Sequence, residues 1–173
     1  MALRIIIGAL KRAYPRVPVM TTDELQHLMK KTASQSGYRK LVLLDTREEK
    51  EFRVSRLANA IRLDPAETDF TKAMKMIQKE AGTSQDPMAV VCYCAVGWRA
   101  SIMSQRLLDE LEKPENQDIK SSMEVYSLEG AIFKWANERK DLVDPDGKDT
   151  DSIHTFDRFW GMLVDKELRR VDP

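Results

Sequence analysis

The architecture of this chain centres on one stretch, Met88-Ala-Val-Val-Cys-Tyr-Cys-Ala-Val-Gly-Trp-Arg-Ala-Ser101. Residues 88–93 form a short apolar run that follows Pro87 and is rich in β-branched side chains, which is typical of a buried strand. From Arg99 onward, apolar residues recur at helical spacing, at Ile102, Met103, Leu107, Leu108 and Leu111. The pattern therefore predicts a strand, a tight turn over 94–99 and a helix.

Cys94 lies where the expected strand ends and the helix begins. The first N–H groups of a helix have no partners within it, and with the helix dipole they place partial positive charge at that end. This environment favours the thiolate, which is the nucleophilic form of cysteine. Gly97 permits a turn whose N–H groups converge on an anion, and Arg99 adds a fixed charge. Cys92, inside the strand, is expected to be a small buried hydrophobe.

Three motifs resemble those of the rhodanese (sulfurtransferase) family, in the same order and spacing. Residues 44–52 read Leu-Asp-Thr-Arg-Glu-Glu-Lys-Glu-Phe, which is similar to the family's Asp-Val-Arg-Glu-x-x-Glu-Phe. Cys94-x-x-Gly97-x-Arg99 resembles its active-site loop, and residues 125–135 resemble its Leu-x-Gly-Gly-x-x-x-Trp. Residues 55–60 depart from the family's Gly-His-Ile-Pro-Gly-Ala, since they read Ser-Arg-Leu-Ala-Asn-Ala. This departure does not involve Cys94, the expected nucleophile.

Alternating strand and helix patterns predict an α/β fold with a mostly parallel sheet covered on both faces. We expect strands over residues 17–20, 41–44, 60–63 and 123–128, and helices starting at Thr21, Phe70 and Gly130. Residues 32–39 and 82–87 are expected to be loops. The resemblance implies the rhodanese-like three-layer fold in particular, a five-stranded mostly parallel sheet flanked by helices on both faces.

The resemblance also implies an activity, transfer of a sulfane sulfur. The Cys94 thiolate takes the sulfur from thiosulfate or a persulfide, and a thiol or cyanide then accepts it from the Cys94 persulfide. Neither a metal nor an organic cofactor is implied. The resemblance places five residues in the active-site loop around the sulfur: Ala95, Val96, Gly97, Trp98 and Arg99. Because Ala95 and Val96 are neutral, thiosulfate is expected to be a poor donor.

Charged residues of two other segments are expected to support this loop. Asp45 ends a buried apolar run, at the sheet edge where α/β proteins gather ligands. Arg99 either binds the donor anion or pairs with Asp45 or Glu51, and we favour the pairing because a loop of backbone donors needs rigid support. Arg47 is a candidate for the same network. Trp98 either stands at the pocket mouth or packs against the C-terminal segment.

Two other functions stay open. A phosphatase of related fold needs Cys-x5-Arg, whereas Arg99 follows Cys94 after four residues and position 100 is Ala. A binding module of the same fold, without turnover, often lacks the loop cysteine. The cysteine and the short loop favour the sulfurtransferase, which p-nitrophenyl phosphate hydrolysis would distinguish from a phosphatase.

The length of 173 residues suits one domain, which we divide into an N-terminal extension (1–16), a rhodanese domain (17–143) and a linker with a C-terminal helix (144–173). With 28 basic and 28 acidic residues, net charge predicts neither a nucleic-acid nor a membrane partner, and it leaves the oligomeric state open. Two cysteines so close in sequence favour a reducing compartment such as the cytoplasm.

The two terminal segments each leave alternatives. The first 16 residues hold four basic and no acidic side chains, which suits either a short packed helix or a mitochondrial presequence. Residues 141–150 are expected to be an exposed linker. An apolar stripe then predicts a helix that packs on the domain or covers the pocket: Ile153, Phe156, Phe159, Trp160 and Leu163. His154, beside this stripe, either helps to line the pocket or lies at the surface, and we favour the surface.

Overall fold

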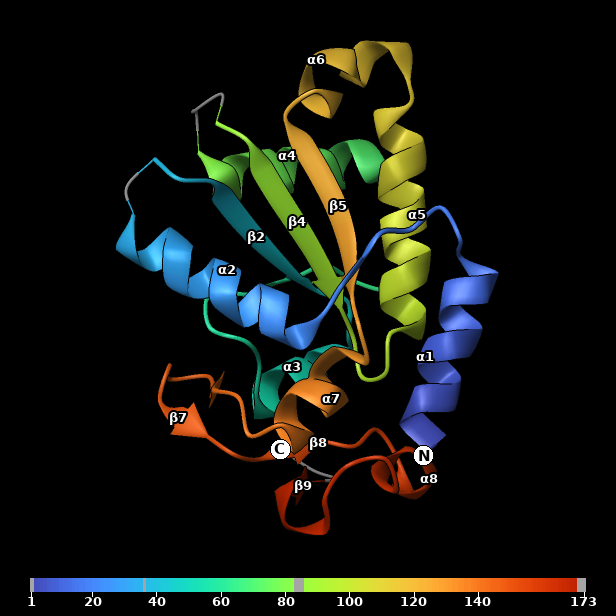
Figure 1. Ribbon diagram of the computed structural model, residues 1–173, viewed down its shortest axis with the longest axis vertical. Helices are drawn as coiled ribbons and strands as arrows, with labels where there is room; N and C mark the ends of the chain where they lie inside the picture. The colour runs from blue at the N-terminus through green and yellow to red at the C-terminus, as the bar shows by residue number, and fades with distance from the viewer. Residues whose placement is uncertain (1, 36, 83–85, 171–173) are drawn as a thin grey trace.

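The computed structural model describes residues 2–35, 37–82 and 86–170. Parts of the loops predicted over 32–39 and 82–87, and the chain's two ends, lie outside these residues. Within them, five strands pair in parallel in the order β1-β5-β4-β2-β3 (Figure 1). Their bounds are Val19–Met20 (β1), Lys40–Asp45 (β2), Ile61–Arg62 (β3), Met88–Tyr93 (β4) and Met123–Leu128 (β5).

Helices cover both faces of this sheet, which confirms the predicted three-layer fold. The longer helices are α1 (Ala2–Ala13), α2 (Thr22–Ser34), α4 (Phe70–Ala81) and α5 (Trp98–Leu111). The shorter ones are α3 (Glu49–Val54), α6 (Gln117–Lys120), α7 (Ala131–Asn137) and α8 (Arg158–Gly161), with single 3-10 turns at Pro114–Asn116 and Lys166–Leu168. Neighbouring residues of β2 point to opposite faces of the sheet: Leu43 packs with α2, α3 and α7, and Val42 packs with α4 and α5.

Local sequence signals account for most of these bounds. Thr21 caps α2 through a reciprocal capping box with Glu24, as the predicted start of that helix requires. The helix continues to Ser34, so the predicted loop over 32–39 begins too early. Asn59 takes a left-handed backbone conformation (φ 61°) at a position where the family pattern has glycine, and asparagine tolerates this conformation better than most residues.

The prediction of a linker over 141–150 is wrong, because this segment forms a β-hairpin, although residues 145–149 are exposed as predicted. Strands β6 (Leu142–Val143) and β7 (Asp149–Thr150) pair antiparallel, and Leu142 is buried in the core. The Asp144 side chain accepts two backbone N–H groups across the turn, at 2.9 Å each. Backbone hydrogen bonds between Val143 and Arg56 then tie the hairpin to the domain.

The predicted long C-terminal helix is also wrong. Strands β8 (Ile153–His154) and β9 (Arg169–Arg170) pair in parallel, and the only helical residues between them are the four of α8 and those of the single 3-10 turn at Lys166–Leu168. A left-handed backbone at Phe156 (φ 66°) ends any helix there. The segment still packs on the domain, since Ile153, Val164 and Leu168 are buried in the same core as α7, whereas Phe159 is 67% exposed.

The N-terminal segment is a helix packed on the domain, as one of the two interpretations predicts. Leu10 is buried, Leu3 and Ile6 pack against the core, and Lys11 pairs with Glu129 at 2.6 Å. Figure 1 shows α1 running beside α5, with its start close to α8. Within the described residues, no helix combines the length and apolar character needed to cross a membrane.

Candidate active site

Cys94 directly follows β4, at the carboxyl end of the central strand. The backbone around it is fixed by neighbouring elements: the N–H groups of Ile132 and Phe133, at the start of α7, donate to the carbonyls of Cys94 and Ala95 at 3.1 Å each. These bonds use helical N–H groups that have no partner inside α7. The loop therefore starts from a rigid position at the end of the sheet.

The turn after Cys94 directs a backbone donor at its sulfur. The Gly97 N–H donates to Cys94 Sγ at 3.1 Å, and α5 begins at the next residue. Gly97 has a left-handed backbone (φ 112°), and a Cβ there would lie 3.1 Å from a methyl of Leu10 in α1. Glycine is thus needed both for the turn and for the close approach of α1. The positive end of a 14-residue helix faces the sulfur.

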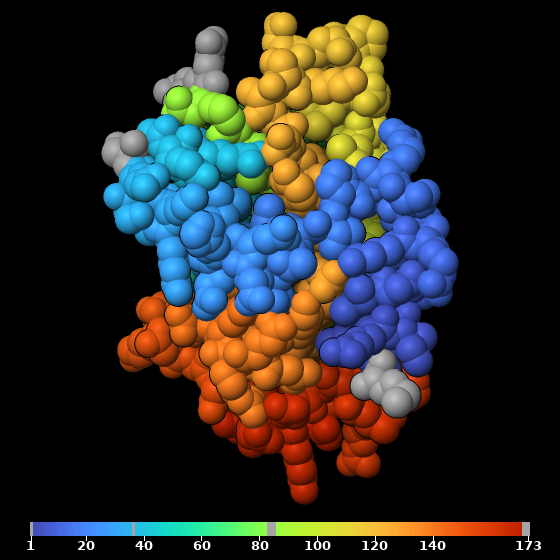
Figure 2. All heavy atoms as spheres, viewed as in Figure 1, coloured from blue at the N-terminus to red at the C-terminus, as the bar shows by residue number. Residues whose placement is uncertain are grey.

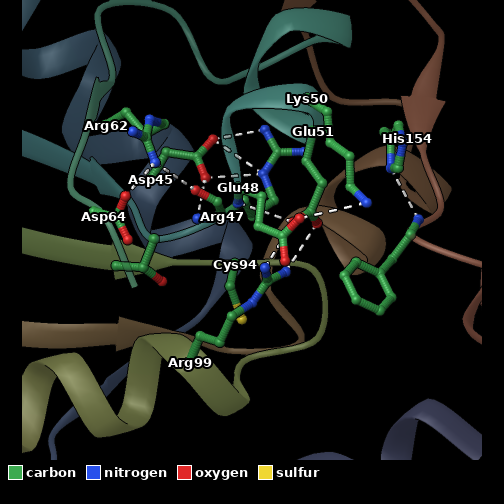
Figure 3. Close-up of polar contacts among 12 residues, drawn as sticks. Asp45, Arg47, Glu48, Lys50, Glu51, Arg62, Asp64, Cys94, Arg99 and His154 are labelled. Atoms are coloured by element: carbon green, nitrogen blue, oxygen red, sulfur yellow. Dashed lines mark hydrogen bonds and ion pairs between the residues drawn. The ribbon is translucent and has the colours of Figure 1, made fainter. Parts of the chain in front are cut away.

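Arg99 is held by Glu51 rather than left free above the loop. Its two terminal nitrogens donate to the two carboxylate oxygens at 2.6 and 2.8 Å, and Figure 3 shows the guanidinium beside Cys94 and directed at Glu51. Burial opposes charge on Glu51, but the bonds and charge of Arg99 hold the pKa of Glu51 below its ordinary value. Burial likewise works to lower the pKa of Arg99, while Glu51 and Cys94 hold it above its ordinary value.

Asp45 and Arg47 form a second, separate pair. Both side chains are buried, and the Arg47 guanidinium donates to both Asp45 oxygens and, at 2.6 Å, to the carbonyl of Ser55. Burial works to lower the pKa of Arg47, but Asp45 holds it above its ordinary value. The sequence suggested one network containing Asp45, Arg47, Glu51 and Arg99. The structure pairs Arg99 with Glu51 and leaves Asp45 with Arg47.

Cys92 and Cys94 occupy different environments although both side chains are buried. Cys92 lies within β4 and packs in the core beneath α4 and α5, where burial raises its pKa to about 12. Cys94 accepts the Gly97 N–H and borders a cavity. The contrast agrees with the sequence interpretation of Cys92 as a small hydrophobe.

A cavity of about 490 Å³ opens above Cys94. Cys94, Ala95, Val96, Trp98 and Arg99 line it from the loop. Ile6 of α1, Glu48, and the C-terminal residues Phe156 and Trp160 complete it. Figure 2 shows the N-terminal segment (blue) and the C-terminal segment (red) meeting at one end of the molecule. Two segments far apart in sequence thus enclose the site.

Trp98 stands beside this cavity with 54% of its surface exposed, as one of its predicted placements requires. Its ring meets Tyr14 edge to face, with centroids 6.2 Å apart, so the neighbour is the N-terminal segment rather than the C-terminal one.

His154 and Ile6 are the residues that sequence reasoning missed or misplaced. The prediction of a surface histidine is wrong, because His154 is buried. Its Nδ1 accepts the Phe156 N–H at 2.9 Å, which fixes the backbone that carries the Phe156 ring to the cavity. The apolar stripe around residue 154 was the available signal. Ile6 gave none, since only the fold brings it to Cys94.

Among the described residues, no three histidine, cysteine, aspartate or glutamate side chains gather in a way that could hold a metal ion. The polar groups that surround the Cys94 thiol are the Gly97 N–H and the Arg99–Glu51 pair.

The sequence profile of the rhodanese-like domain matches residues 21–138. The chain belongs to this family. No curated protein matches the rhodanese-like chain beyond chance.

Solved structures share the fold at low sequence identity. A thiosulfate sulfurtransferase from Pseudomonas aeruginosa is 20% identical with a TM-score of 0.57, over 91% of this chain and 25% of that one. A yeast protein tyrosine phosphatase of the rhodanese family is 16% identical (TM-score 0.54; 69% of this chain, 83% of that one). An As-Sb reductase from Leishmania major is 17% identical (TM-score 0.53; 78% and 92%). These similarities establish the fold but not the activity.

Proposed function

We propose that this rhodanese-like protein is a sulfurtransferase that carries a sulfane sulfur as a persulfide on Cys94. The observation that carries the proposal is the turn from Cys94 to Arg99. Its Gly97 N–H lies 3.1 Å from Cys94 Sγ, at the positive end of α5. Such an environment favours the thiolate and a terminal sulfur anion bound to it.

The reaction has two displacement steps. The Cys94 thiolate attacks the outer sulfur of the donor, a new S–S bond forms, and the donor's own bond to that sulfur breaks. The donor leaves with the electron pair, as sulfite from thiosulfate or as a thiolate from a persulfide. An acceptor thiolate or cyanide then attacks the outer sulfur and releases the Cys94 thiolate. No metal or organic cofactor enters, and thiol acceptors suit the cytoplasmic compartment that we propose.

The loop residues have distinct parts in this scheme. Backbone N–H groups between Ala95 and Arg99 stabilise negative charge on the sulfur in both steps. Arg99 is a positioning residue whose charge also lies near that sulfur, because Glu51 holds its guanidinium through two bonds. Asp45 and Arg47 support the loop indirectly, because they pair with each other and not with a loop residue. Their buried pair fixes the chain after β2.

The loop length argues against phosphate chemistry. Four residues separate Cys94 from Arg99, whereas the related phosphatases need five to seat a phosphate. The names of two structural neighbours, a tyrosine phosphatase and an As-Sb reductase, show that this fold also hosts other reactions in other proteins. We therefore expect no hydrolysis of p-nitrophenyl phosphate.

Intact-mass measurement after incubation with a donor tests the proposal. Thiosulfate, mercaptopyruvate and glutathione persulfide are each added to the wild type and to Cys94→Ser, and excess donor is removed. The wild type should gain the mass of one sulfur atom with at least one donor and lose it to an acceptor thiol. A wild type that binds a protein partner but never gains sulfur would instead support a binding module.

A further inference from the structure

We infer that the sulfur donor or acceptor carries an uncharged apolar group of at least aromatic-ring size, which sits between α1 and the C-terminal segment. The inference rests on the proposed function and names its substrate class. It makes Phe156 and Trp160 specificity-determining residues, and it makes His154 a positioning residue for Phe156.

The size and lining of the cavity carry the first part of this inference. Its volume of about 490 Å³ lies within the range of small-molecule sites, far above what sulfite or cyanide would fill. Apart from the thiol, its walls are built largely from apolar side chains: Ile6, Val96, Trp98, Phe156 and Trp160. An apolar group that leaves water for this cavity gains free energy in proportion to the area it buries.

The charges around the cavity carry the second part. Among the described residues that line it, Arg99 is the cationic one, and both ends of its guanidinium are bound by Glu51. The other charged lining residue is Glu48, a carboxylate that pairs with Lys50 at 3.4 Å. A substrate with a second anionic group would therefore meet charged side chains that already have partners. The loop N–H groups accommodate one anion at the reacting sulfur, and each charged side chain among the described lining residues is already paired.

The backbone at Phe156 carries the third part. A phenylalanine with φ 66° is strained, and such strain persists where the surrounding structure holds it. Here the buried His154 Nδ1 accepts the Phe156 N–H at 2.9 Å, which is the hydrogen bond that an asparagine makes in an Asx-turn. The ring also lies against two cations, 5.7 Å from Arg99 and 5.2 Å from Lys50. The fold thus holds an aromatic ring at the cavity edge next to Arg99.

A pair of matched donors tests the inference. Benzenethiosulfonate and methanethiosulfonate have the same charge and reacting group, and each gives its outer sulfur to Cys94 and leaves as the sulfinate. The ratio of their kcat/KM values, benzene over methane, is measured in wild type, Phe156→Ala and Trp160→Ala. Intrinsic reactivity cancels between variants. We expect each alanine variant to lower the ratio about tenfold, because the benzene compound loses more apolar contact than the methane compound.

Control variants separate the specific effect from a general one. Met162→Ala alters the same segment at a side chain that is 65% exposed, and it should keep the wild-type ratio. His154→Asn preserves the hydrogen bond to the Phe156 N–H and should also keep the wild-type ratio. His154→Leu removes that hydrogen bond and should lower the ratio. A ratio that is equal in wild type, Phe156→Ala and Trp160→Ala would overturn the inference.

Binding of the product sulfinates keeps the inference distinct from the proposed function. Benzenesulfinate should change tryptophan fluorescence at lower concentration than methanesulfinate, because Trp98 and Trp160 line the cavity. That preference without any sulfur transfer would overturn the proposed function and support the apolar site. Sulfur transfer with no preference for the benzene compounds would support the proposed function and overturn the apolar site.

Discussion

The Cys94 loop and the C-terminal segment both border the same cavity, but different forces hold them. The loop is fixed by backbone hydrogen bonds from α7, by the Gly97 turn and by the Arg99–Glu51 pair. The C-terminal segment is held by apolar burial at Ile153, Val164 and Leu168, and it contributes Phe156 and Trp160 to the cavity. In our proposal, the reactivity of Cys94 depends on short-range geometry, whereas the choice of substrate depends on a distant part of the chain.

The largest effect should come from removing the nucleophile. Cys94→Ser should lower sulfur transfer at least about 1,000-fold, because no other group can carry the sulfur. Cys92→Ser changes the other sulfur of the same strand, inside the core, and should retain turnover while lowering the melting temperature. Steady-state assays of both variants check this. Equal activities in Cys94→Ser and the wild type would remove the loop from the mechanism.

The next effect concerns the pair that braces the loop. Glu51→Gln leaves Arg99 partly buried without its counter-charge, so we expect the free energy of unfolding to fall by about 3 kcal/mol. Glu49→Gln, on the same helix, removes a half-exposed carboxylate that pairs with Arg53 and Arg62, and it should cost less than about 1 kcal/mol. Urea denaturation measures both. Similar losses of unfolding free energy in the two variants would mean that the Glu51–Arg99 pair does not stabilise the loop.

A comparable test applies to the C-terminal segment. Ile153 is fully buried, so Ile153→Ala should lower the free energy of unfolding by about 2–4 kcal/mol. Phe159→Ala, six residues along, removes a side chain that is 67% exposed and should change it by less than about 0.5 kcal/mol. If Ile153→Ala were as stable as Phe159→Ala in thermal or urea unfolding, the segment would not belong to the core.

The smallest expected effect is a dependence of stability on acid. Arg99 holds the pKa of Glu51 in the folded protein below its unfolded value. The pair therefore stabilises the fold at pH values above the unfolded pKa, and this contribution is lost as pH falls through the folded pKa. Below about pH 4, the melting temperature of the wild type should fall more steeply than that of Glu51→Gln. Parallel curves for the two proteins would contradict the assignment.

The domain body could be predicted from sequence because its signals are local. The apolar run over 88–93 and the helical spacing over 70–81 each specify one element, and the structure places β4 and α4 at those residues. Cys94, Gly97 and Arg99 lie within six residues, so their convergence on one site follows from a single turn.

The C-terminal segment could not be predicted because its structure depends on remote partners. The spacing of Ile153, Phe156 and Trp160 suits a helix, but Ile153 pairs with Arg169 in a parallel ladder that no local pattern signals. The choice of partner for Arg99 is equally remote, since Asp45 ends β2, Glu51 lies shortly after it in α3, and only the fold distinguishes them. Ile6 reaches the cavity because α1 packs across the Gly97 turn.

The central claim is that Cys94 carries the transferred sulfur, and isotope tracing tests it most directly. A donor labelled at its outer sulfur is added, the protein is digested, and the peptides holding Cys92 and Cys94 are separated from the rest and fragmented. We expect the label to sit on Cys94 and to appear on an acceptor thiol when one is added. Label on Cys92, or label that reaches the acceptor without ever residing on Cys94, would contradict it.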